Sequence, residues 1–177
     1  MKRCFKLGAM AVACAAGVMV SAGAANSTSS ADRLHEVGLF QGTGTTASGA
    51  PQYDLDRAPT RAEAAVMLVR LLGKEADAKA LTYTAPFTDL EGWEAPYVQY
   101  LYDNKLATGA TATTFEPKAK CSAQMYTTFL LRSLGYSDAQ NGDFTYTGAL
   151  DFAADNVGLI DESFCDTNNF LRDNVAA

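Results

Sequence analysis

The sequence predicts a mainly α-helical fold made of tandem helix–loop–helix repeats. Thr60 and Glu63 have the spacing of a capping box, in which each residue's side chain accepts from the other's backbone N–H. Gly73 stands where a left-handed residue commonly ends a helix. The apolar residues between these signals recur three and four apart on one face: Ala64, Met67, Leu68, Leu71 and Leu72. Residues 60–73 are therefore the best-specified helix in the chain.

The same pattern returns 62 residues later without a gap. The counterparts of the cap, the apolar face and the closing glycine are Ser122, Phe129, Leu130, Leu134 and Gly135. Upstream of each helix, residues 38–42 also match 105–109 and 158–160. The chain is thus predicted to hold two units and part of a third. Because the period is longer than in most solenoids, each unit should contain two helices and a substantial loop.

The remaining elements follow from the spacing of apolar residues. Residues 31–40 are expected to be the first helix of unit one, with Leu34 and Val37 on its apolar face. A flexible loop follows at 42–51, about five residues longer than its counterpart in unit two. Residues 74–85 are polar and join the units.

Unit two is expected to continue with helices at 94–104 and 122–134. Unit three restarts at Asp143 and reaches Ala177 about one turn into its second helix. A unit without its last helix leaves an apolar face uncovered, so we expect the chain to be a fragment of a longer protein.

The N-terminus resembles an export signal. A basic start, an uncharged Ala-rich run over 7–20 and small residues at 22–24 predict a signal peptide over residues 1–25. A transmembrane anchor would need a longer and more apolar run. Lipid modification at Cys14 is a further alternative, but Ala11 replaces the larger aliphatic residue that such a site prefers. Residues 26–30 are expected to form a flexible spacer.

Composition indicates a folded domain, with 48% hydrophobic and 19% charged residues. Removal of the signal's basic residues leaves 11 of the 14 Lys and Arg against 20 acidic residues, a net charge of −9. This balance argues against nucleic-acid binding, which rests on clustered Lys and Arg. In the mature chain Cys121 and Cys165 could pair as a disulfide or stay free.

No catalytic or metal-binding pattern stands out. His35 is the one histidine and has no marked partner for nucleophilic catalysis, so we expect it at the surface. Asp54 and Asp56 lie too close together to form a calcium loop.

Several of the repeated motifs together resemble the S-layer homology (SLH) domain, which retains proteins on bacterial cell walls. The motifs are Phe87-Thr-Asp-Leu followed by Trp93, Leu106-x-x-Gly109, Phe115-x-Pro117 and Thr60-Arg-Ala-Glu63. The resemblance implies three repeats, at 31–85, 86–139 and, in part, 140–177. It also implies a pseudo-threefold helical bundle with grooves between neighbouring repeats.

The resemblance implies a non-catalytic module without cofactor or metal, exported to the cell wall or surface. Its expected partner is a pyruvylated secondary cell-wall polysaccharide, and neither nucleic acid nor, after signal cleavage, a membrane is expected. Further C-terminal domains of the same protein are expected as well. The ligand-binding positions carried over from the family are Arg61, Asp89, Trp93, Gly42 and Gly109.

Each binding residue also has a structural interpretation. Arg61 lies off the apolar stripe, so its replacement is expected to change stability little. It could be a solvated first-turn residue, while Trp93 could belong to the core and Asp89 could cap a helix.

The chain also departs from the family pattern at several positions. Ala123, Met125 and Tyr146 stand where other units have Arg61, Glu63 and Asp89, although Arg172 lies near the place expected for an arginine in unit three. Only the groove between units one and two looks fully equipped. Alternatives to wall binding are therefore a structural or protein-interaction domain without sugar affinity, or the scaffold part of a larger exported enzyme.

Overall fold

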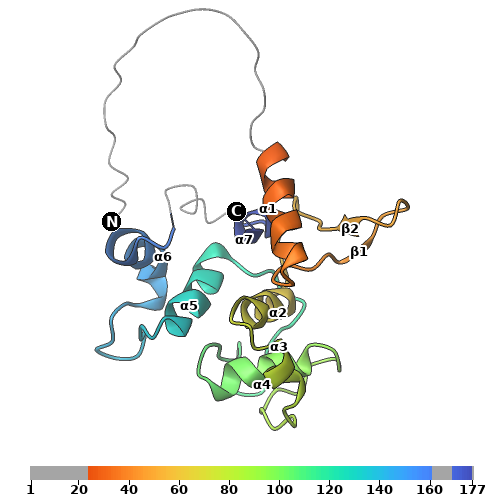
Figure 1. Ribbon diagram of the computed structural model, residues 1–177. Coiled ribbons are helices and arrows are strands. Elements are labelled where there is room, and N and C mark those ends of the chain that lie inside the picture. Colours follow the sequence, from red (N-terminus) through yellow and green to blue (C-terminus); the bar gives the residue numbers. More distant parts are fainter. Residues whose placement is uncertain (1–23, 161–168, 177) are drawn as a thin grey trace, which may run out of the picture.

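The computed structural model describes residues 24–160 and 169–176, and over these ranges the chain is mainly helical, as predicted (Figure 1). The helices are α1 Ala24–Glu36, α2 Arg61–Leu71, α3 Glu75–Lys79, α4 Ala95–Asp103, α5 Ala123–Ser133, α6 Ala149–Phe152 and α7 Arg172–Ala176. A 3₁₀ turn, η1 (Tyr146–Gly148), precedes α6, and a π-helical turn, η2 (Ala153–Val157), follows it. Strands β1 (Gly44–Thr45) and β2 (Pro51–Gln52) form an antiparallel hairpin that projects from the helices.

The predicted start and end of α2 are confirmed. Thr60 Oγ1 accepts from Glu63 N at 3.2 Å, and Glu63 Oε2 accepts from Thr60 N at 2.8 Å, which completes the capping box. Gly73 follows the helix with a φ of 67°. In α5 only half of this device remains, because Ser122 Oγ accepts from Met125 N but a methionine has no carboxylate to return.

The second helix of each unit packs against the first helix of another unit. Helix α2 lies on α4, α5 lies on α6, and α7 lies beside α1 (Figure 1). These pairings run from unit one to two, from two to three and from three back to one, so the contacts close into a cycle. The α1–α7 pair brings together the two ends of the described chain.

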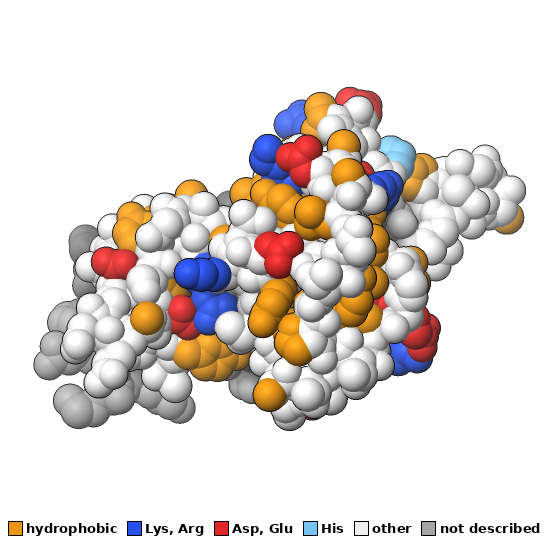
Figure 2. Space-filling model, turned by 90° about the horizontal axis from the view of Figure 1, so that it is seen from below, with side chains coloured by type: hydrophobic (Ala, Val, Ile, Leu, Met, Phe, Trp, Pro, Cys, Tyr) orange, Lys and Arg blue, Asp and Glu red, His pale blue; other side chains and the backbone are white. Residues whose placement is uncertain are grey.

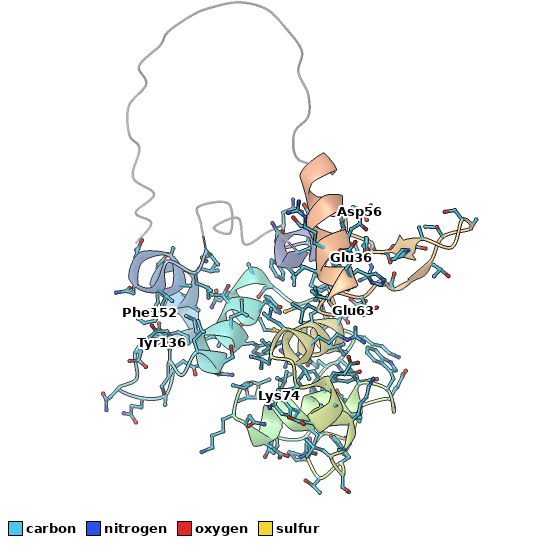
Figure 3. The ribbon with its side chains drawn as sticks, in the orientation of Figure 1. Glu36, Asp56, Glu63, Lys74, Tyr136 and Phe152 are labelled. Carbon is cyan, nitrogen blue, oxygen red and sulfur yellow. The ribbon has the colours of Figure 1, made fainter. Side chains whose placement is uncertain are left out.

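Most of the apolar side chains form one core. Its largest fully buried members include Phe40, Leu68, Leu101 and Phe115. A second, smaller cluster lies between α5 and α6, where the Tyr136 and Phe152 rings meet edge to face with centroids 5.2 Å apart (Figure 3).

The structure corrects the predicted limits of the first helix. α1 begins at Ala24, so residues 26–30 are helical and not a spacer, and it ends at Glu36. Gly38 then adopts a φ of 76°, and the N–H groups of Leu39 and Phe40 both donate to Leu34 O. This turn places Phe40 in the core and leaves Val37, expected on the apolar face, 66% exposed.

Two further elements were not predicted. The hairpin β1–β2 occupies the segment expected to be a flexible loop, and α3 occupies part of the polar connection between units. Ala78 is the only buried residue that α3 contributes, so the short helix has no apolar period to reveal it.

Some expectations fall outside the described ranges. These are the signal peptide, apart from its last two residues, and Cys165. Within residues 24–160 and 169–176, every helix is too short or too polar to span a bilayer.

Candidate functional site

Arg61 is buried at the N-terminus of α2, where it joins that helix to unit two. Only 7% of the residue is exposed. Its Nε donates to Phe115 O at 2.7 Å and its Nη2 to Thr108 O at 3.2 Å, while the guanidinium carbon lies 4.6 Å from the centre of the Phe115 ring. Burial lowers the pKa of Arg61. The interpretation of Arg61 as a solvated first-turn residue was wrong. Because its partners are carbonyls contributed by a distant segment, we now expect its replacement to lower stability.

Arg172 is bound in the same way by two carbonyls and an aromatic ring of unit one. Its Nε donates to Tyr53 O at 2.8 Å and its Nη2 to Gln41 O at 3.2 Å, and its guanidinium lies 5.0 Å from the centre of the Phe40 ring. Arg172 is 3% exposed, and burial lowers its pKa. Each of these two arginines thus fastens the start of one unit's second helix to the loop of another unit.

The surroundings of Arg61 and Arg172 differ in the group that lies next to Nη1 of the arginine. Arg172 Nη1 lies 3.7 Å from Glu63 Oε1, between α2 and the α1–α7 pair (Figure 3). Arg61 Nη1 instead lies 2.9 Å from the sulfur of Met125, the counterpart of Glu63 in unit two. Glu63 also accepts from both terminal nitrogens of Arg57, at 2.8 and 2.5 Å. Burial raises the pKa of Glu63, but the bonds from Arg57 and Thr60 outweigh it and the net pKa is lowered.

This comparison predicts that Met125→Glu stabilises the protein. The new carboxylate would face Arg61 and could complete a capping box with Ser122. We expect the free energy of unfolding to rise by roughly 0.5–1.5 kcal/mol, measured by urea denaturation at pH 7. Met125→Gln is the control, because it can serve the cap but carries no charge. A Glu variant no more stable than the Gln variant would contradict the ion pair.

Asp89 and Gly109, both predicted to bind ligand, have structural partners in the loops of unit two. The Asp89 carboxylate accepts from Phe115 N at 2.8 Å and from Glu116 N at 2.7 Å. Burial raises the pKa of Asp89, but these bonds outweigh it and the net pKa is lowered. At Gly109 a Cβ would lie 2.4 Å from the Phe87 ring. Neither residue needs a ligand to account for its position.

Gly42 and Trp93, in contrast, line one hollow of about 630 Å³ between α2, α4 and the loop 41–43. Trp93 is 57% exposed, so it does not belong to the core. Gly42 is required by the packing of the hairpin, because a Cβ at this position would lie 2.7 Å from Gln52 O. Its absence of a side chain therefore needs no ligand to explain it. Of the five predicted residues, the structure brings these two together and places Arg61, Asp89 and Gly109 elsewhere.

The hollow carries cations that the sequence did not mark as site residues. Arg70, Lys79 and Arg172 line it, against the single lining carboxylate of Glu63. Among the described residues, the buried Nε of Arg70 has no hydrogen-bond partner. This nitrogen is shielded from solvent, so an anionic group in the hollow would interact with Arg70 through the charge of its guanidinium.

Glu75, on α3, holds two of these cations, Arg70 and Lys79, in place. It accepts from Arg70 Nη2 at 3.1 Å and from the Tyr97 hydroxyl at 2.6 Å, and it pairs with Lys79 at 2.9 Å. The hydrogen bond from Arg70, followed by that from Tyr97, lowers the pKa of Glu75 to about 2. The unpredicted helix α3 thus contributes directly to the charge of the hollow.

The described residues include no group of three or more His, Cys, Asp or Glu side chains placed to hold a metal ion. Cys121 is a buried thiol with no disulfide partner among the described residues, and burial raises its pKa to about 12. Such a thiol is poorly suited to nucleophilic chemistry at neutral pH.

Parts of the chain are similar to a known domain family and to several known proteins. The model of the S-layer homology domain matches residues 86–122. The middle cell wall protein of Brevibacillus brevis is 30% identical over 112 residues, which is 62% of this chain and 10% of that protein. The same identity and coverage hold for the surface layer protein of Brevibacillus choshinensis. An endoglucanase of Bacillus sp. (strain KSM-635) is 28% identical over 104 residues, 52% of this chain and 11% of the enzyme. The chain thus spans about a tenth of the length of these relatives.

Proposed function

Since the chain carries an S-layer homology domain, we propose that it is a non-catalytic module that attaches an exported protein to the bacterial cell wall. Its ligand is a pyruvylated secondary cell-wall polysaccharide. The ligand binds in the hollow between α2, α4 and the loop 41–43, hereafter the main groove.

The observation that carries this proposal is an exposed indole beside three cations in one hollow. The face of Trp93 offers an apolar surface for the C–H side of a sugar ring. Arg70 and Lys79 offer charge-assisted hydrogen bonds to a ketal carboxylate. Three cations line the hollow against one carboxylate, so its charge suits an acidic sugar better than a neutral one.

We assign the role of the motif arginine at the groove to Arg172 in place of Arg61. Arg172 lines the main groove and holds Gln41 O at its wall, whereas Arg61 docks on the loop of unit two. Arg172 therefore acts chiefly by positioning the wall of the groove, and the groups available to a ligand are Arg70, Lys79 and Trp93.

Two other functions compete with wall binding. A structural or protein-interaction role requires no sugar affinity, and the endoglucanase among the relatives raises the possibility of a scaffold within a larger enzyme. Sedimentation with purified wall sacculi, before and after acid removal of the secondary polymer, separates these functions. Pelleting that depends on the polymer supports attachment, and pelleting that is absent or unaffected by acid overturns it.

Trp93→Ala is the direct test of the main groove. We expect sacculus binding to weaken roughly tenfold because the stacking surface is lost. The midpoint of thermal unfolding should change by no more than about 2 °C because the residue is mostly exposed. Tyr102→Ala is a matched control, since Tyr102 is an exposed aromatic residue of α4 outside the hollow. Equal binding by both variants would contradict the proposed site.

A further inference from the structure

We propose that the chain binds an oligosaccharide of more than one sugar, through a second subsite formed by the β1–β2 hairpin. A hollow of about 490 Å³, hereafter the hairpin subsite, lies between the end of α1 and the hairpin. Its lining includes His35, Thr45, Gly49 and Pro51. This inference rests on the proposed function and adds to it the length and direction of the bound polymer.

The hairpin subsite adjoins the main groove. Gln41, Gly42 and Thr43 line both hollows, so one strip of backbone borders the two. The proposed ligand follows this strip from the main groove into the hairpin subsite. Each hollow falls within the range of volumes typical of small-molecule sites. Together they suit a chain of linked rings better than a single ring.

The two hollows differ in charge. Residues 37–52, which include the whole hairpin, contain no Asp, Glu, Lys or Arg, and Figure 2 shows the hairpin as a projection almost without charged side chains. The hairpin subsite therefore offers hydroxyl, amide and backbone groups, which match neutral sugar hydroxyls. The cations of the main groove match the acidic sugar. The ketal end of the polymer thus lies by Trp93, and the neutral sugars that follow lie along the hairpin.

His35 can add a specific hydrogen bond. Its Nδ1 lies 3.3 Å from Phe40 O, and its ring meets the Tyr53 ring edge to face at 5.9 Å. Because a carbonyl only accepts, this contact selects the tautomer in which Nδ1 donates, and in that tautomer Nε2 can accept from a sugar hydroxyl.

The strip shared by the two hollows is held in place before any ligand binds. Thr43 N donates to Gln52 O at 2.7 Å, and Thr43 Oγ1 donates to Asp54 Oδ2 at 2.6 Å. On the other side, Arg172 Nη2 donates to Gln41 O. Such a fixed wall lowers the entropic cost of binding a flexible glycan.

Trp93 is the one tryptophan of the chain, so its fluorescence reports occupation of the main groove. The probes are fragments of the wall polymer released from sacculi by mild acid and separated into one-sugar fragments and fragments of three or more sugars. We expect the longer fragments to bind the full chain about tenfold more tightly. Gly44→Leu, which places a side chain in the open space of the hairpin subsite, should remove this advantage and leave one-sugar binding unchanged. Ser48→Leu, on the same hairpin but outside the hollow, is the matched control and should keep the advantage.

The outcomes separate the two proposals. If one-sugar fragments bind but longer fragments bind no better, or if Gly44→Leu behaves as Ser48→Leu does, the hairpin subsite is wrong and the main groove stands. If no fragment binds the wild-type chain, the proposed function fails and the hairpin subsite fails with it.

Discussion

Arg61→Ala should lower the free energy of unfolding by about 3 kcal/mol, because a buried guanidinium with several backbone partners is removed. The substitution leaves Phe115 O and Thr108 O without their donor and removes the cation from the face of the Phe115 ring. Among the described side chains, no other donates to these two carbonyls, so the link between α2 and unit two at this point is lost. Urea denaturation followed by far-UV circular dichroism measures the loss.

Two further variants test the cause of this loss. Arg61→Lys keeps the charge but lacks the planar fork that reaches both carbonyls, so it should recover only part of the stability. Arg33→Ala removes an exposed arginine of α1 and should change stability by about 0.5 kcal/mol at most. If Arg61→Ala lowered the free energy of unfolding no more than Arg33→Ala does, the hydrogen bonds of Arg61 would make no net contribution to stability.

The sequence predicted the fold best where the signals are local. The cap at Thr60 and the glycine at 73 mark the two ends of one helix, and both predictions hold. The predicted apolar face holds only in part, because Ala64, Met67 and Leu68 are buried but Leu71 is 48% exposed. The first helix was misplaced because Gly38 reverses the chain before the apolar residues end. Helix α3 escaped prediction because a five-residue helix with one buried side chain shows no period.

The burial of Arg61 could not be predicted from local sequence signals. Its partners lie 47 and 54 residues further along the chain, and they are main-chain carbonyls, which carry no mark in the sequence. The side chain itself stands off the apolar stripe, as a solvated residue would. Only the cyclic packing of the helices brings the carbonyls to it.

The same packing explains why only two of the five predicted binding residues, Gly42 and Trp93, line the main groove. Gly42, Trp93 and Arg172 come from units one, two and three, yet all three line the main groove. Prediction from adjacent repeats paired Trp93 with Arg61, which docks on the loop of unit two. The sequence did show Arg172 near the place expected for the third unit's arginine, but without the cyclic packing of the units it could not be assigned to this groove.

Arg172→Ala should therefore affect both stability and binding. We expect a loss of about 3 kcal/mol in the free energy of unfolding, as for Arg61→Ala, because Tyr53 O and Gln41 O lose a buried donor. In addition, sacculus binding should weaken roughly tenfold, because the released strip 41–43 forms a wall of the main groove and the hairpin subsite. Binding is measured at a low temperature at which circular dichroism shows the variant to be folded.

Arg61→Ala is the matched control for this effect on binding. Arg61 has a similar burial and the same kind of carbonyl partners as Arg172, but it does not line the main groove. We expect its binding to change less than about threefold, which corresponds to under about 0.7 kcal/mol. A loss confined to Arg172→Ala assigns the effect to the wall of the groove. An equal loss in both variants would mean that lowered stability alone weakens attachment, and the role proposed for Arg172 would be wrong.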